Sequence, residues 1–309
     1  MKKLLVGFAI CVAAIAALLY FSPAALMATA QFAERQGAGL SNEQVMVGDL
    51  SIHYYHGGPA DGETLLMIHG FGANKDNWVR FSKFFTKRYN VIALDLPGFG
   101  DSSKPDASYD VGTQAERVSS FVETLGVGKV HVVGNSMGGQ IAALLASRHP
   151  EQVRSLALFD NSGVTSPVKS ELYEILQRGE PNPLVARDAE GFDRLVSFVF
   201  VEPPKVPANV RRYMAEQASA RSEQNAKIFS QLLARPIPLE PELPKIQAPT
   251  LLLWGDKDRT LDVSSIDVMK PLLKNPTVVI MKNCGHVPMI ERPEETAGHY
   301  QDFLNSVKG

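Results

Sequence analysis

The stretch Gly134-Asn135-Ser136-Met137-Gly138 constrains the fold of this chain more than any other segment. It follows a largely apolar run at 130–133 and precedes a helix-forming stretch at 139–146. A strand, a sharp turn flanked by glycines and a helix together present one serine hydroxyl on a strained elbow. Larger side chains at Gly134 or Gly138 would collide with the strand or the helix. The pattern predicts Ser136 as a nucleophile, although a glycine-rich turn that only packs a helix on a strand has the same sequence.

Short apolar runs recur along the body of the chain and alternate with helix-like segments such as 110–125. Continuous apolar runs of this length are typical of parallel strands buried on both faces. We therefore predict an α/β fold with a mostly parallel sheet and an antiparallel hairpin at Val45–Tyr55, broken at Gly48-Asp49. The predicted buried strands are Thr64–Ile68, Val91–Leu94, Val130–Val133, Leu156–Phe159, Thr250–Trp254 and Val278–Met281.

One long region interrupts this alternation. Residues 162–245 contain no convincing buried strand, and nine prolines border a helix-rich stretch at 209–233. Insertions of this length in α/β domains are often active-site lids, although a plain structural subdomain is the alternative. We predict a helical cap at 162–245, a core at 41–161 and 246–309, and an N-terminal anchor with a juxtamembrane helix at 1–40.

Composition narrows the class of partner. The chain has 31 Lys and Arg against 33 Asp and Glu, so no basic field points to nucleic acid. Only Cys11 and Cys284 occur, and we expect a fold that does not depend on disulfides.

The N-terminus indicates a membrane. After Lys2 and Lys3, residues 4–21 are uncharged and mostly apolar, a length that suits a spanning helix. A signal peptide cleaved near Ala30 and a buried soluble helix are the alternatives. Cytoplasmic lysines would place the body across the membrane, in a bacterium the periplasm. Alanines at 9, 13 and 17 would let two such helices pair, so a homodimer is a further expectation.

A serine nucleophile requires a general base and an acid that orients it. Of seven histidines, His286 lies in a glycine and proline loop after the last predicted strand, from which it could reach the strand ends. Asp258 follows the strand at 250–254, and we prefer it as the acid because two loop residues let it turn back toward the site. Asp160, at the end of an earlier strand, and Asp256 remain competitors.

Stabilisation of a developing oxyanion requires backbone N–H donors near the serine. The turn His69-Gly70-Phe71-Gly72 follows the strand at 64–68, so the amide of Phe71 could pair with that of Met137. Among the neighbouring residues we expect substrate contacts from His69, Gly70, Gly72, Asn135 and Val287.

Taken in order, these motifs resemble those of the α/β-hydrolases over roughly residues 45–309. The segments that carry the resemblance are His69–Gly72, Asp95–Ser102, Gly134–Gly139, Gly255–Asp258 and Gly285–Pro288. Within that superfamily the chain is similar to bacterial lipases and membrane-anchored phospholipases A related to monoacylglycerol lipases. Haloalkane dehalogenases and epoxide hydrolases share the fold but use an aspartate at the elbow, where this chain has Ser136.

The resemblance implies hydrolysis of fatty-acyl esters, with Ser136, His286 and Asp258 as the triad and without cofactor or metal. Two alternatives stay open. The enzyme could act on soluble esters, amides or carbon–carbon bonds, or the chain could be a non-catalytic homologue that binds a fatty acid or signal.

Overall fold

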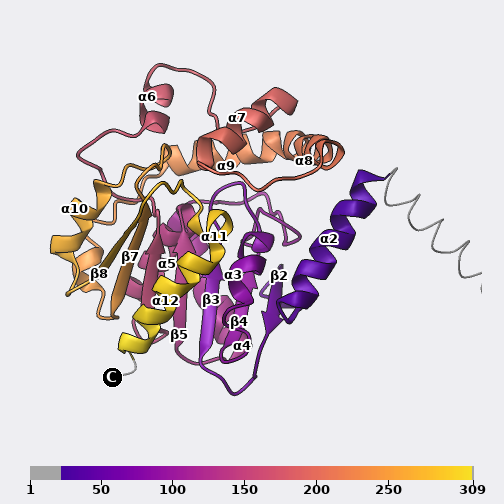
Figure 1. Cartoon of the computed structure of the whole chain (residues 1–309). Helices are drawn as coiled ribbons and strands as arrows, with labels where there is room; N and C mark the ends of the chain where they lie inside the picture. The colour runs from indigo at the N-terminus through magenta and orange to yellow at the C-terminus, as the bar shows by residue number, and fades with distance from the viewer. Residues whose placement is uncertain (1–21, 308–309) are drawn as a thin grey trace, which may run out of the picture.

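A computed structural model describes residues 22–307, and a single eight-stranded sheet forms its centre (Figure 1). The strand order is β1-β2-β4-β3-β5-β6-β7-β8. The last six strands in this order run parallel: β4, β3, β5, β6, β7 and β8. The hairpin β1-β2 forms one edge, with β2 antiparallel to β4. The strands are β1 (Leu40–Val47), β2 (Leu50–Gly57), β3 (Thr64–Ile68), β4 (Asn90–Leu94), β5 (Val130–Asn135), β6 (Val153–Phe159), β7 (Thr250–Gly255) and β8 (Thr277–Met281).

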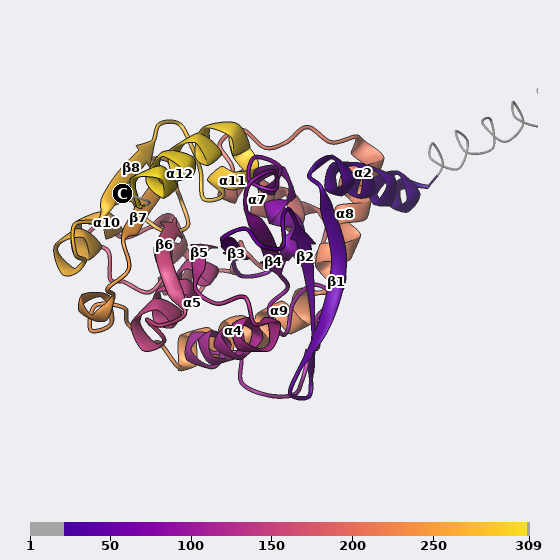
Figure 2. The same ribbon diagram turned by 90° about the horizontal axis from the view of Figure 1, so that it is seen from below.

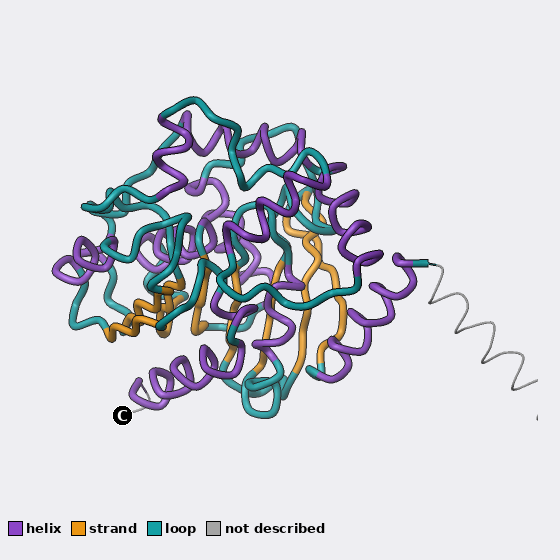
Figure 3. Tube along the Cα trace, turned by 45° about the horizontal axis from the view of Figure 1, so that its top comes forward, coloured by secondary structure: helices purple, strands orange, loops and turns teal. Residues whose placement is uncertain are grey.

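Helices cover both faces of this sheet, as the view from below shows (Figure 2). One face carries α4 (Val111–Leu125), α5 (Met137–Arg148) and α10 (Ser265–Met269), and the other carries α3 (Val79–Ser82), α11 (Pro288–Glu291) and α12 (Pro293–Val307). Short 3-10 helices occur at η1 (Lys75–Trp78), η2 (Leu243–Lys245) and η3 (Lys270–Leu272). The Cα trace shows the strands as a layer between helices (Figure 3).

Alternate side chains of the central strands fill two separate cores. In β3, Leu66 and Ile68 face one core while Leu65 and Met67 face the other, and all four are at most 1% exposed. Successive residues of a strand point to opposite faces, so a strand that is covered on both faces must be apolar throughout. This is why continuous apolar runs predicted the parallel strands to within three residues of their ends. The predicted α/β fold with a mostly parallel sheet is confirmed.

Between β6 and β7 the chain forms helices and no strand. The helices are α6 (Glu171–Gln177), α7 (Ala189–Val199), α8 (Ala208–Ala220) and α9 (Ser222–Ala234), and they lie above the sheet at the end where β5 passes into α5 (Figure 1). Within the predicted helix-rich stretch at 209–233, Ile228 is fully buried in a core of the sheet, whereas Leu233 is 61% exposed.

At the N-terminal end, α2 (Pro23–Gly37) begins after the cap residue Ser22, whose side chain accepts from the Ala25 amide. Its ion pair between Glu34 and Arg80 of α3 measures 2.6 Å. Among residues 22–307, no helix combines the length and the apolar character needed to cross a bilayer. The apolar run at 4–21, on which the predicted anchor and the pairing alanines depend, lies outside the described residues.

Candidate active site

Ser136 occupies a sharp turn between β5 and α5 with φ 57° and ψ −123°. A positive φ is strained for a residue with a side chain and costs roughly 1–3 kcal/mol. The flanking glycines have no room for a side chain, because a Cβ on Gly134 would lie 2.2 Å from the Gly138 carbonyl oxygen, and one on Gly138 would lie 2.3 Å from that of Ile68. The strand, turn and helix therefore converge so tightly that they hold the serine in this conformation.

His286 and Asp258 form a short, buried pair. The Nδ1 of His286 lies 2.7 Å from Asp258 Oδ2, and the two side chains are 6% and 0% exposed. The other Asp258 oxygen accepts the amides of Thr260 and Leu261 at 2.7 and 3.1 Å. Asp258 is thus fixed by its own loop, and it accepts the Nδ1–H of His286 and leaves Nε2 available as a base.

The elbow and the histidine loop are joined by the residue before the serine. Asn135 Nδ2 donates to the backbone oxygens of His286 and Phe159, at 2.9 and 3.1 Å. Above this loop, the His286 amide donates to the carbonyl of Val199 at the end of α7, at 2.9 Å. These bonds hold together two segments, around Asn135 and His286, that are 151 residues apart in sequence. Both segments lie between the sheet and the overlying helices.

Asp160 lies beside this pair and is fully buried with φ 47°. Its Oδ1 accepts the Gly255 amide at 2.8 Å, whereas no N–H or hydroxyl donor among the described residues reaches Oδ2. Polar atoms of Asp160, Asp258 and His286 all lie within 4.8 Å of one another. Such spacing would suit a metal ion, but His286 Nδ1 and Asp258 Oδ2 are already bonded to each other at 2.7 Å. Burial, reinforced by the Asp258 carboxylate, raises the pKa of Asp160 well above its ordinary value.

Replacement of Asp160 with asparagine tests this protonation state. A folded-state pKa above the unfolded one means that the folded protein binds the extra proton, so wild-type stability should fall as pH rises past the ordinary carboxyl pKa near 4. The loss is at most about 1.4 kcal/mol per pH unit. Asparagine can still accept from Gly255 and donate to Asp258. Thermal melts from pH 4 to pH 8 should show Asp160→Asn gaining steadily on wild type, and a pH-independent difference would contradict the assignment.

The predicted oxyanion turn lies against the serine. A Cβ on Gly70 would be 3.0 Å from Ser136 Cβ, and the next residue, Phe71, packs edge-on against Phe99 and Phe229. His69 is fully buried, with Nδ1 donating to the Gly70 carbonyl at 2.8 Å and Nε2 accepting the Leu96 amide at 3.0 Å. Burial lowers the pKa of His69, which keeps the ring neutral, as this bonding requires.

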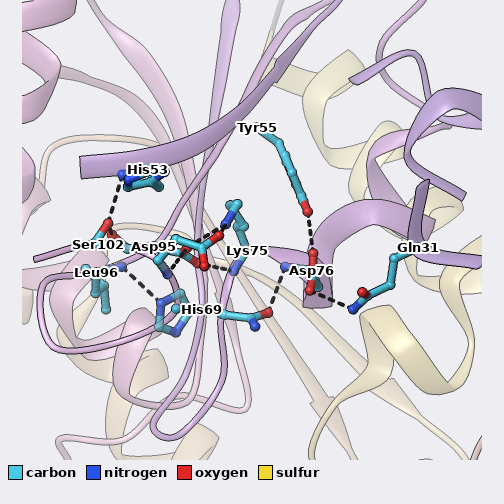
Figure 4. A network of polar contacts seen from close by, with 12 residues as sticks. Gln31, His53, Tyr55, His69, Lys75, Asp76, Asp95, Leu96 and Ser102 are labelled. Atoms are coloured by element: carbon cyan, nitrogen blue, oxygen red, sulfur yellow. Dashed lines mark hydrogen bonds and ion pairs between the residues drawn. The ribbon is translucent and has the colours of Figure 1, made fainter. Parts of the chain in front are cut away.

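A buried polar network holds the loop beyond that turn (Figure 4). Lys75 Nζ lies 2.7 Å from Asp95 Oδ2 and 2.6 Å from Asp101 Oδ2, and its side chain is 4% exposed. Burial alone would lower the pKa of Lys75, but the two carboxylates outweigh it and raise that pKa. Asp76 accepts from Tyr55 and from Gln31 of α2, at 2.5 and 3.1 Å. The network therefore connects η1 to the loop after β4 and to α2.

Several residues expected from the sequence lie together, but burial favours different roles for some of them. Asn135 is 2% exposed and His69 is fully enclosed, which favours positioning roles over the expected substrate contacts. Ser136, Phe71 and Gly72 are partly exposed, and Val287 is 8% exposed. Sequence reasoning missed Lys75, because nothing local distinguishes a buried lysine from a surface one, although Asp95 and Asp101 already stood in a recognised motif.

Comparisons with known proteins agree with this fold. A family model described as the alpha/beta hydrolase fold matches residues 63–293. Lipase 1 of Psychrobacter immobilis is 36% identical over 259 residues, which cover 83% of this chain and 81% of that protein. Monoacylglycerol lipase ABHD6 of Homo sapiens is 31% identical over 299 residues, covering 92% and 88%. The crystal structure of a membrane phospholipase A, a bacterial virulence factor, is 62% identical and superimposes with a TM-score of 0.92 over 100% of both chains. A parallel sheet, a strained serine elbow and a sequence match over most of its length thus place this chain in the α/β-hydrolase family.

Proposed function

We propose that this protein is a carboxylic ester hydrolase that cleaves acyl lipids through an acyl-enzyme on Ser136. One observation carries the proposal. The hydrogen bond from Asn135 to the His286 backbone connects the strained serine turn to the buried pair of His286 and Asp258. A nucleophile after β5, a base after β8 and an orienting acid after β7 form the constellation that acyl transfer requires.

The mechanism follows from these positions. Ser136 Oγ attacks the ester carbonyl while His286 Nε2 takes its proton, and Asp258 stabilises the imidazolium through Nδ1–H. The amides of Phe71 and Met137 hold the negative charge on the carbonyl oxygen. His286 then protonates the departing alcohol, which leaves the acyl group on Ser136. A water molecule attacks that ester as His286 accepts its proton, and the fatty acid leaves when the proton returns to Ser136 Oγ.

Acyl lipids are the proposed substrates for two reasons. The relatives named above are a lipase, a monoacylglycerol lipase and a membrane phospholipase A. The apolar run at 4–21 would hold the enzyme at a bilayer, where acyl esters are concentrated. We further propose that the run is a retained anchor, that the core at 41–161 and 246–309 faces the periplasm, and that residues 162–245 form a lid. A protein released from membranes by high salt alone would contradict the anchor.

Incubation of purified protein with a mixed pool of phospholipids and monoacylglycerols, followed by lipid extraction and mass spectrometry, tests the activity. We expect free fatty acids and the matching deacylated lipids, and none of these with Ser136→Ala. A fluorophosphonate probe should label wild type and not this variant. Hydrolysis of soluble esters without acyl lipids would overturn the proposed substrate class, and absence of both labelling and hydrolysis would overturn catalysis.

A further inference from the structure

A cavity of about 210 Å³ lies between the core loops and the junction of α8 with α9. The loop after β3 and the loop after β4 form one side of it, and the helix junction forms the other. The lining residues that matter here are Gly72, Asn74, Lys104, Arg221, Gln224 and Asn225. This volume accommodates a phosphate group with several waters of hydration.

The charged residues in this lining are both cations. Lys104 Nζ donates to the carbonyls of Gly100 and Ser102, at 2.7 and 3.2 Å, and within residues 22–307 no carboxylate lies within 4.0 Å of it. Arg221 is exposed and, over the same residues, its side chain has no hydrogen-bond or ion-pair partner. Asp101, which stands near Lys104, is already bound to Lys75 Nζ at 2.6 Å. The cavity therefore has a positive charge without a counter-charge from its own walls.

Neutral donors complete the cavity. The side-chain amides of Gln224 and Asn225 are half-buried, and neither has a hydrogen-bond partner in the described part of the chain. Both belong to the first turn of α9. Cationic side chains and amide donors together are the groups that bind phosphate oxygens. A neutral glycerol would leave the two charges unpaired.

The cavity also has the right distance from the serine. Gly72 follows Phe71 directly, and a Cβ on Gly72 would lie 3.5 Å from Asn225 Nδ2. Gly70, two residues earlier, abuts Ser136, and two residues of chain span at most about 7 Å. The three-carbon glycerol that separates ester from phosphate in a lysophospholipid bridges a comparable distance. The ion pairs of Lys75 with Asp95 and Asp101 fix the two core loops that hold the cavity open.

We propose that this cavity binds the phosphate of a phospholipid headgroup, with Arg221 and Lys104 as its charged ligands, while the acyl ester lies at Ser136. The assignment rests on the proposed function and selects phospholipids over neutral glycerides within it. Arg221 is the better residue to test, because Lys104 also caps two carbonyls of its own loop.

The test compares a lysophospholipid with a monoacylglycerol of the same acyl chain, using full-length protein in neutral detergent micelles. The measured quantity is the ratio of the two kcat/KM values. Loss of one charged hydrogen-bonding ligand should lower this ratio about 10- to 100-fold in Arg221→Gln. Arg212→Gln is the matched control, since Arg212 is an exposed arginine of α8 outside the cavity whose loss changes net charge equally. An unchanged ratio in Arg221→Gln, or an equal fall in Arg212→Gln, would overturn the proposal.

A second measurement separates a lipid headgroup from free phosphate. Millimolar inorganic phosphate, compared with chloride at equal ionic strength, should raise the melting temperature of wild type more than that of Arg221→Gln. A phosphate-dependent shift with an unchanged substrate ratio would mean a free-anion site and would refute the headgroup assignment. A wild-type protein that cleaves neither lipid would instead refute the proposed function, and a phosphate shift equal in wild type and Arg221→Gln would refute the site independently.

Discussion

Ser136→Ala should lower kcat for p-nitrophenyl ester hydrolysis by roughly 10⁴- to 10⁶-fold, because the covalent route through the acyl-enzyme is lost. The residual rate would come from substrate binding and the backbone amides of Phe71 and Met137, which remain in place. Steady-state kinetics measures the loss, with enough enzyme present to detect the residual rate. Wild-type hydrolysis by the alanine variant would exclude Ser136 as the nucleophile.

Ser136→Gly is the informative companion, because it separates chemistry from backbone strain. Both variants lack the hydroxyl, but alanine keeps a Cβ at φ 57° while glycine adopts this conformation freely. Glycine relieves about 1–3 kcal/mol of strain but loses more conformational entropy on folding. We therefore expect Ser136→Gly to be more stable than Ser136→Ala by about 0.5–2 kcal/mol. Urea denaturation measures the difference. Equal stabilities would show that the elbow is not strained.

Asp258→Asn should lower kcat by about 10⁴-fold while the protein stays folded. The asparagine oxygen can keep the amides of Thr260 and Leu261, so its NH₂ must face His286 Nδ1. That nitrogen would then have to accept, which moves the ring proton to Nε2 and removes the base that Ser136 needs. The rate should recover partly at high pH, where hydroxide replaces the general base.

Asp160→Asn and Asp256→Asn complete this experiment, since the sequence left all three aspartates as candidates for the acid that orients His286. Asp160 faces Asp258 and has no contact with His286 of hydrogen-bond length, and Asp256 Oδ1 accepts the Asn283 amide at 2.7 Å. We expect both variants to stay within about tenfold of wild type, the loss expected where no proton-transfer partner is removed. A loss of 10³-fold or more in Asp160→Asn with activity retained in Asp258→Asn would exchange their roles.

Local patterns were sufficient for most of the fold. The continuous apolar run of β3 and the break at Gly48-Asp49 between β1 and β2 each contain the physical reason for the element they form. A strand covered on both faces must be apolar throughout, and a hairpin turn requires residues that tolerate unusual backbone angles. The glycines around Ser136 belong to the same class, because close backbone approach excludes every larger residue.

The contacts between side chains of different elements could not be predicted from local patterns. Asp160 and Asp258 both follow buried strands, and only their packing gives Asp258 the His286 bond and leaves Oδ2 of Asp160 without a donor among the described residues. The sequence predicted a substrate contact from His69, but both of its ring nitrogens form hydrogen bonds with backbone groups. Lys75 has no local signal at all, since its burial depends on carboxylates 20 and 26 residues away.

Sequence alone was enough to predict the α/β class, the strand positions, the serine on its elbow and the order of serine, acid and histidine. These properties depend on backbone geometry and side-chain periodicity, which neighbouring residues decide. The pairing of Asp258 with His286, the bonds that hold the predicted oxyanion turn, and the position of Arg221 and Lys104 on one cavity all depend on the tertiary structure. Those properties depend on charges and hydrogen bonds between segments far apart in the chain, whose energies depend on burial and distance, and neither can be read from local sequence.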